Sequence, residues 1–216
     1  MKLKQRMGAV LRPALAGAVL ASALAACTTA APVHYYTLVG PLPASAPAAA
    51  GFDIDVLPVV VAPGLRRRAM VLRTGTAELM VQDGHQWQAP LPDELRAALS
   101  ADLVAAFGTR DLSGLQPAGR PLYRIALVVQ RFDAVYGGSV DVGATWSVYA
   151  ADDTPLLTCA ARVTRTVQKA GYAELAQGAQ QALAAIAAQI GTALVALPQM
   201  VCPPVAPRMV GERAGH

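Results

Sequence analysis

The residues best placed for covalent chemistry lie near the start of the 216-residue chain, where Leu24-Ala25-Ala26 precedes Cys27. A deprotonated thiol is a nucleophile, and the alanines before it leave room for a modifying enzyme. A basic start and an apolar run over residues 14–26, interrupted only by Ser22, come before this cysteine. That order is typical of a secretory signal peptide. We therefore expect cleavage between Ala26 and Cys27.

A cysteine directly after Leu-Ala-Ala resembles the lipobox of bacterial lipoproteins. The resemblance implies a diacylglyceryl group on the Cys27 thiol, an N-acyl group on the new N-terminus, and no other cofactor. The alternative is a plain transmembrane anchor with an incidental cysteine, but the apolar run is shorter than the ~20 residues that a spanning helix needs. Such lipoproteins carry Asp after the cysteine when they stay in the inner membrane. Thr28 at this position therefore implies the periplasmic face of the outer membrane.

Removal of residues 1–26 changes the charge of the chain. The four charged residues lost are all basic (Lys2, Lys4, Arg6, Arg12), so the 18 Lys and Arg fall to 14, equal to the 14 Asp and Glu, and the formal net charge of +4 falls to zero. The basic isoelectric point belongs to the signal peptide, so it gives no reason to expect a nucleic-acid partner.

The two remaining cysteines, Cys159 and Cys202, lie in the part of the chain that we expect to reach an oxidising compartment. Disulfides persist there. We predict a Cys159–Cys202 disulfide that ties the end of the chain to a strand; the alternative is one buried and one loose thiol.

Composition and periodicity predict the elements of one domain over residues 34–197. Strands are expected at 34–39, 52–61, 69–73, 78–81, 123–132, 139–149 and 156–167, with turns at Thr74-Gly75-Thr76, Asp83-Gly84 and Gly137-Gly138. Pro92-Asp93-Glu94 opens a helix that Gly108 ends, and an apolar stripe predicts a second helix over 172–197. This order predicts an α+β two-layer sandwich: an antiparallel or mixed sheet with both helices on one face. Residues 27–33 form a short acylated tether, and 198–216 a Pro-rich, disordered tail.

Groups that could serve catalysis are few. The three His form no His-x-x-x-His, the cysteines no Cys-x-x-Cys, and no glycine-rich phosphate loop is present, so no metal site is expected. Gly137-Gly138-Ser139 lacks the second glycine of a nucleophile elbow and is better explained as a hairpin turn. Asp53 and Asp55 could pair as acid and base, but their alternation with Ile54 and Val56 favours a solvated strand face. The chain is therefore not expected to be an enzyme.

Arg66, Arg67 and Arg68 form one dense basic cluster. Guanidinium groups pair bidentately with carboxylates and phosphates, so the cluster is a candidate contact for lipid headgroups or an acidic partner. The alternative, which we favour, is a charged strand entrance that blocks edge pairing. Trp87 and Trp146 are expected to anchor the core rather than to bind a ligand.

Several segments, taken in order, resemble the ABC-type transport auxiliary lipoproteins of the paraquat-inducible protein C group. The likeness covers nearly all of residues 27–197. The segments that carry it are Tyr35-Tyr36-Thr37-Leu38, Arg67–Val71 with Arg73-Thr74-Gly75, Trp87-Gln88-Ala89-Pro90-Leu91, Arg131-Phe132, Trp146, and Tyr172-Ala173-Glu174-Leu175. Arg68 departs from the family pattern, which often has proline there, and the cysteine pair is an addition.

The resemblance implies a non-enzymatic part of an envelope transport system for phospholipid or other hydrophobic cargo. Its partners would be an inner-membrane permease and a periplasmic MCE-domain (mammalian cell entry) tunnel protein that it docks at the outer membrane. Because such a tunnel is a symmetric ring, a homo-oligomer would match it. Two alternatives stay open: a lipoprotein that assembles or plugs an outer-membrane β-barrel, and one that binds a small apolar ligand.

Overall fold

The computed structural model describes residues 31–41, 49–115, 119–197, 199 and 201–204, and the described residues from Val33 onward form one compact unit. Its elements follow the order β1 (His34–Tyr36), β2 (Asp53–Val56), β3 (Val60–Val61), a 3-10 turn η1 (Pro63–Leu65), β4 (Ala69–Arg73), β5 (Leu79–Trp87), α2 (Leu91–Phe107), β6 (Leu122–Ala134), β7 (Ser139–Ala150), β8 (Pro155–Thr166) and α3 (Tyr172–Val195).

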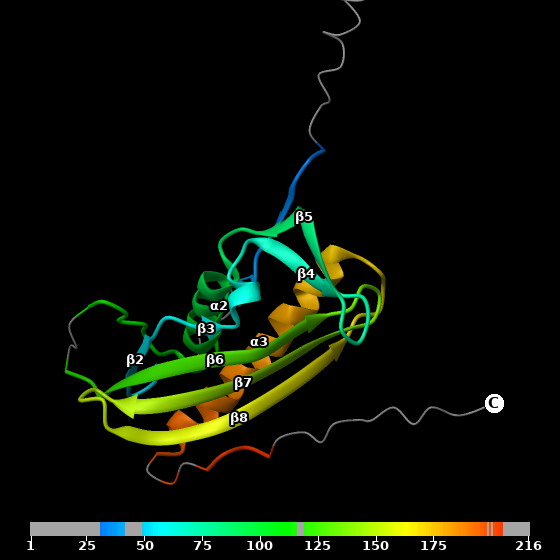
Figure 1. Ribbon diagram of the computed structural model, residues 1–216. Coiled ribbons are helices and arrows are strands. Elements are labelled where there is room, and N and C mark those ends of the chain that lie inside the picture. The colour runs from blue at the N-terminus through cyan, green and yellow to red at the C-terminus, as the bar shows by residue number, and fades with distance from the viewer. Residues whose placement is uncertain (1–30, 42–48, 116–118, 198, 200, 205–216) are drawn as a thin grey trace, which may run out of the picture. The chain divides into compact units, whose positions relative to one another are not determined.

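The strands form one mixed eight-stranded sheet in the order β1-β5-β4-β6-β7-β8. The long strands β6, β7 and β8 are antiparallel and joined by tight turns. The short strands β2, β3 and β4 pair in parallel with successive stretches of one edge of β6. Strand β5 is antiparallel to β4, and β1 adds to it in parallel. Both helices lie behind this sheet (Figure 1), which confirms the predicted α+β architecture.

The helices begin where the sequence predicts, and α2 ends as predicted, whereas α3 ends at Val195, two residues before the expected end. Helix α2 has proline and the acidic Asp93 in its first turn, and it ends at Gly108, which adopts φ 63° and donates its N–H to the Val104 carbonyl. Helix α3 packs against α2 at close range, since a Cβ on Gly191 would lie 2.0 Å from Cε2 of Phe107. A side chain at position 191 would therefore force the two helices apart.

Alternation along the long strands builds the core. In β7 the residues that face α3 are all buried, among them the fully buried Trp146. Trp87 is also buried, and its ring meets that of Phe132 edge-on with centroids 6.1 Å apart. Both tryptophans anchor the core, as expected.

Three local predictions need correction. The first strand ends at Tyr36, and the strand expected over 52–61 is two strands with a break at Leu57–Val59, because Pro58 has no N–H to donate. Asp83-Gly84 makes no hairpin turn but lies inside β5. The neighbours Ala69 and Met70 of β4 pair with Gln86 and Gln82, so residues 83–85 bulge out of the strand there.

No helix in the described part of the chain combines the length and apolarity that spanning a bilayer requires. The expected signal peptide (1–26), including Ala26, and the acylated Cys27 fall outside the described residues, as does most of the expected tail over 198–216.

Candidate functional site

Three of the segments that prompted the family resemblance meet where the N-terminal segment joins the sheet: Tyr35–Leu38, Trp87–Leu91 and Tyr172–Leu175. Strand β1 pairs in parallel with the end of β5, so that His34, Tyr35 and Tyr36 lie beside His85, Gln86 and Trp87. The Gln88 N–H then donates to the Tyr36 carbonyl at 2.7 Å. The first described strand is therefore held at one end of the sheet, next to the starts of both helices.

An aromatic stack forms around the bulge in β5. The His85 ring stacks on Tyr172 of α3 with centroids 3.5 Å apart and lies 5.2 Å from the ring of His34. The Tyr36 hydroxyl lies 2.9 Å from Nδ1 of His85. Burial, and then the nearby His34, lower the pKa of His85, which favours a neutral ring that accepts this hydrogen bond. Burial also raises the pKa of Tyr36, so the pair stays uncharged and holds β1 in place.

Glu94 in the first turn of α2 fastens the residues that follow β1. Its carboxylate accepts hydrogen bonds from the Leu38 N–H at 2.7 Å, the Thr37 hydroxyl at 2.9 Å and the Ala89 N–H at 3.1 Å. The side chain is 4% exposed, and these donors replace the water that it loses. Gln180 of α3 adds a hydrogen bond to the Thr37 carbonyl at 2.9 Å. Side chains of both helices therefore hydrogen-bond to the N-terminal segment.

The sequence did not single out Glu94 for this role. Its position in the first helical turn has a sufficient explanation in the helix dipole. Only the fold brings Thr37 and Leu38 to the same place as Ala89, so the sequence carried no separate signal for the clamp.

The arginine cluster lies beside this junction. Arg66, Arg67 and Arg68 are all exposed between η1 and β4, and none forms an ion pair with a described residue. Strand β4 lies between β5 and β6 and pairs with β6 at Leu72 and Ala134, so the structure does not favour the edge-blocking explanation. The cluster therefore remains a candidate contact for anions.

At the far end of the sheet, the structure contradicts the expectation that Asp53 lies on a solvated strand face. Its side chain is fully buried, not solvated. Arg110 donates to it at 3.0 and 2.7 Å, and Arg120 at 2.5 Å. The hydrogen bonds from Arg110 contribute most to lowering the Asp53 pKa. Asp55 is half-buried and pairs instead with Arg124 at 3.2 Å, so the two carboxylates do not act together.

The outer face of β6–β8 carries a ladder of ion pairs. Arg131 bridges Asp133 at 2.5 Å and Asp141 at 2.9 Å, and Arg162 also pairs with Asp141 at 2.5 Å. The hydrogen bond from Arg162 is the largest favourable cause of the lowered Asp141 pKa, against an opposing effect of burial. Each carboxylate is neutralised by its neighbours, which suits a charged solvent face.

The cysteines that we paired from the sequence are bonded in the structure, with 2.02 Å between the sulfur atoms of Cys159 and Cys202. Cys159 is buried in β8, and the described residues 201–204 lie along the edge of that strand (Figure 1).

No metal centre is evident in the described regions, whereas open surface hollows are present, among them one of about 450 Å³ lined by apolar residues such as Phe52, Phe107 and Leu194. No three His, Cys, Asp or Glu residues there are grouped to hold a metal ion. The apolar interior space beneath β4, lined by residues such as Met70, Phe132 and Leu175, measures about 10 Å³. That is about the space of one water molecule.

Comparison with known proteins assigns the chain to a family. The model of the ABC-type transport auxiliary lipoprotein component matches residues 36–191, so the chain belongs to this family and is an auxiliary lipoprotein component of an ABC-type transport system. The comparison with curated proteins found no match.

Solved structures share the fold. An uncharacterised protein aligns with a TM-score of 0.63 and 22% identity over 76% of this chain and 99% of its own. A protein from Xanthomonas campestris aligns with a TM-score of 0.56 and 20% identity over 76% of this chain and 95% of its own. At these identities the likeness concerns the fold alone.

Proposed function

We propose that this lipoprotein is a non-enzymatic adaptor, anchored to the periplasmic face of the outer membrane through acyl groups on Cys27. It docks the far end of an inner-membrane-anchored MCE tunnel protein, whose permease partner moves phospholipid or other hydrophobic cargo. The observation that carries the proposal is the family match over residues 36–191, preceded by Leu24-Ala25-Ala26-Cys27.

The fastening of the N-terminal segment supports an adaptor. An anchored adaptor transmits force between its lipid and its partner through the residues just after the tether. Here those residues are held by β1 pairing, by two hydrogen bonds to Glu94 and by one from Gln180. The interior space of about 10 Å³ is too small for an apolar ligand, so the alternative of an apolar-ligand binder depends on the open hollow of about 450 Å³ beside Phe52, Phe107 and Leu194.

Recovery of partners tests the docking role. The lipidated chain, crosslinked in intact cells and purified from the membrane, should carry an MCE-domain protein. A β-barrel in its place would support the assembly function instead, and recovery of neither would contradict the proposal. Cys27→Ser should abolish both acylation and this recovery, while Thr28→Ser, which leaves the lipobox intact, serves as the matched control.

Membrane fractionation tests the location. Thr28→Asp should shift the protein from the outer to the inner membrane, because it restores the retention residue that the resemblance associates with that membrane. An unmutated chain that fractionates with the inner membrane would contradict the outer-membrane assignment.

A further inference from the structure

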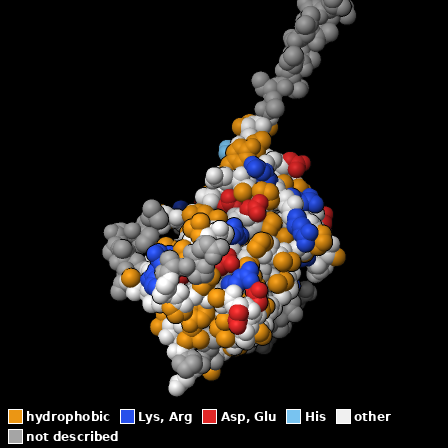
Figure 2. All heavy atoms as spheres, turned by 90° about the vertical axis from the view of Figure 1, so that its left-hand side faces the viewer, with side chains coloured by type: hydrophobic (Ala, Val, Ile, Leu, Met, Phe, Trp, Pro, Cys, Tyr) orange, Lys and Arg blue, Asp and Glu red, His pale blue; other side chains and the backbone are white. Residues whose placement is uncertain are grey.

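Large apolar side chains are exposed along the side of the domain where the described chain begins. We call this group the entry edge, and its members are between 41% and 60% exposed: Val33, Tyr35, Leu79, Met80, Val81 and Tyr136. Figure 2 shows hydrophobic side chains gathered, together with a histidine and basic side chains, where the described chain enters the domain.

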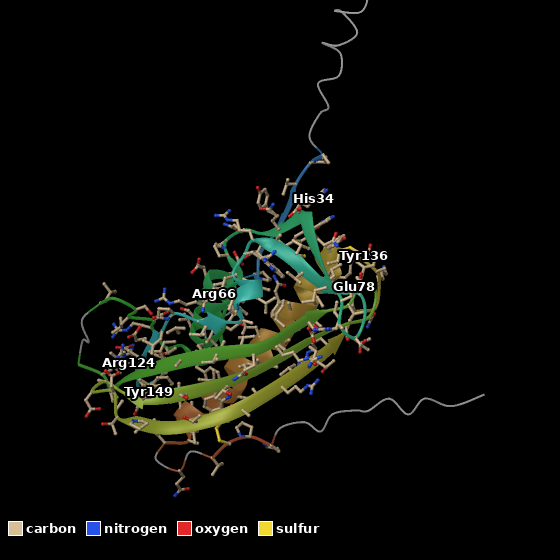
Figure 3. All side chains as sticks on the ribbon, in the orientation of Figure 1. His34, Arg66, Glu78, Arg124, Tyr136 and Tyr149 are labelled. Atoms are coloured by element: carbon tan, nitrogen blue, oxygen red, sulfur yellow. A yellow bond between two sulfur atoms is a disulfide. The ribbon has the colours of Figure 1, made fainter. Side chains whose placement is uncertain are left out.

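The sheet topology brings these residues to one side. Strand β1 pairs only with His85–Trp87, so the first half of β5, with Leu79 and Val81, has no described strand on its outer side. The hairpin tips at Glu78 and Tyr136 lie together (Figure 3). An Arg73–Asp133 ion pair at 2.9 Å and the pairing of Leu72 with Ala134 hold them there.

The entry edge differs from the other sheet surface. On the outer face of β7 and β8 the positions between buried residues are filled by small and polar side chains such as Thr145, Ser147 and Ala160. Contiguous exposed aliphatic and aromatic residues mark a surface that contacts a partner or a membrane, whereas isolated ones need no explanation.

The short chain between Cys27 and the entry edge indicates that this surface lies near the membrane. Val33 lies six positions after Cys27, and a fully extended chain of that length spans roughly 20 Å. An acyl anchor on Cys27 therefore keeps Val33 and its neighbours within about 20 Å of the lipid headgroups.

The basic residues near β1 also favour contact with lipid phosphates. The Trp87 N–H donates to the Arg68 carbonyl at 2.7 Å, and Trp87 lies beside Tyr36, so the arginine cluster begins two strands from β1. Arg66, Arg67 and Arg68 are adjacent and exposed, whereas the exposed carboxylates Glu78, Asp83 and Asp93 are spread from the start of β5 to the first turn of α2. Guanidinium groups bind phosphate bidentately.

We propose that the entry edge is a bilayer-docking surface. Leu79, Val81 and Tyr35 enter the boundary between headgroups and acyl chains, and Arg66–Arg68 bind lipid phosphates beside them. The inference rests on the lipid anchor of the proposed function. It adds that the anchored domain has one fixed side against the membrane, so the remaining surface is left for the transport partners.

Depth-dependent quenching tests this orientation in the full, lipidated protein. Leu79→Cys and Tyr35→Cys variants carry an environment-sensitive fluorophore and are reconstituted into vesicles of phosphatidylethanolamine and phosphatidylglycerol that contain a headgroup nitroxide lipid. Matched labels at Ala184→Cys and Ala188→Cys of α3 occupy exposed alanines that do not adjoin either disulfide cysteine in the chain. We expect at least threefold stronger quenching at positions 79 and 35 than at the two controls.

Each result of the quenching experiment supports or overturns a stated part of the proposal. Equal quenching at the four positions, or none at any of them while the protein floats with the vesicles, overturns the docking surface and leaves the anchor intact. Failure of the lipidated chain to float overturns the anchor and the docking surface together. Replacement of Arg66, Arg67 and Arg68 by Gln should halve the quenching at position 35 in anionic vesicles and leave it unchanged in phosphatidylcholine vesicles. Unchanged quenching in the anionic vesicles overturns the phosphate contacts.

Discussion

The two ends of the described chain are fastened to the domain by different chemistry. The N-terminal segment is held by many weak contacts: pairing of β1 with β5, the Tyr36–His85 hydrogen bond and the hydrogen bonds of Thr37 and Leu38 to Glu94. The C-terminal segment is held to β8 by one covalent bond, Cys159–Cys202. The family match spans residues 36–191, so it includes the hydrogen bonds of Thr37 and Leu38 to Glu94, whereas His34 and Tyr35 precede it and Cys202 follows it.

The two attachments differ in how they depend on folding. The residues that hold the N-terminal segment come from β5, α2 and α3, so its attachment forms only when the domain folds. The disulfide instead closes a loop of 43 residues in the unfolded chain as well as in the folded one. It can be removed without disturbing the contacts at the entry edge.

Breaking the covalent attachment should have the largest effect on global stability. A Cys159→Ser/Cys202→Ser double variant should lose about 3 kcal/mol of unfolding free energy, because the unfolded chain regains the entropy that the closed loop removes. Denaturant unfolding of the oxidised wild type and the variant measures this loss. An unchanged midpoint would show that the bond does not constrain the unfolded chain, and the reduced wild type is the matched control.

Removing the Glu94 carboxylate should lower the global free energy of unfolding less than loss of the disulfide does, but it should increase the exchange of nearby amides. Glu94→Ala removes the acceptor of three donors and should cost about 2 kcal/mol, limited because the freed segment can reach water. Hydrogen exchange at Leu38 and Ala89 should rise, while exchange in β8 stays as in the wild type. Asp93→Ala, at the exposed neighbouring position, is the control and should leave both amides protected.

Asp53 offers a comparison with Glu94, because it is buried with two arginines instead of neutral donors. Asp53→Asn should cost about 1.5 kcal/mol at pH 7, since Arg110 is half-exposed and can rehydrate. The folded-state pKa of Asp53 lies below its ordinary 3.8. Its stabilisation is therefore present above pH 3.8 and lost as the pH falls through the folded-state value.

Unfolding experiments at pH 7 and pH 3 check this dependence. The gap between wild type and Asp53→Asn should narrow at the lower pH. A gap that stays constant would show that the charge of Asp53 is not what Arg110 and Arg120 recognise.

Asp102 of α2 should give the smallest effect and the opposite sign. Burial raises its pKa to about 6. Ionisation of this carboxylate opposes folding above that pH, and the cost disappears as the pH falls below the unfolded value near 3.8. Asp102→Asn should therefore stabilise the protein by about 1 kcal/mol at pH 7.5, a value reduced for partial exposure to solvent.

The gain from Asp102→Asn should shrink between pH 6 and pH 4, as thermal unfolding across that range will show. A gain that does not depend on pH would contradict the raised pKa. Asp55→Asn, at a half-buried position paired with Arg124, is the matched control and should not stabilise the protein.

The sequence by itself determined the parts of this protein that depend on local order. Alternation in β6–β8 and the stripe in α3 set which faces are buried, and Gly108 and the Gly137-Gly138 turn end elements where predicted, because periodicity and backbone conformation act over a few residues. The family segments predicted the class of protein for the same reason: their order is a property of the chain.

Only the tertiary structure decided what long-range contacts control. It placed β4 between β5 and β6, which does not favour an edge-blocking role for Arg66–Arg68, and it buried Asp53 by bringing Arg110 and Arg120 to it from 57 and 67 residues away. It also brought Thr37 and Leu38 to Glu94, so that an acid in the first turn of a helix accepts their hydrogen bonds. Partners this distant leave no period or spacing in the sequence, since their proximity is set by how the strands and helices pack.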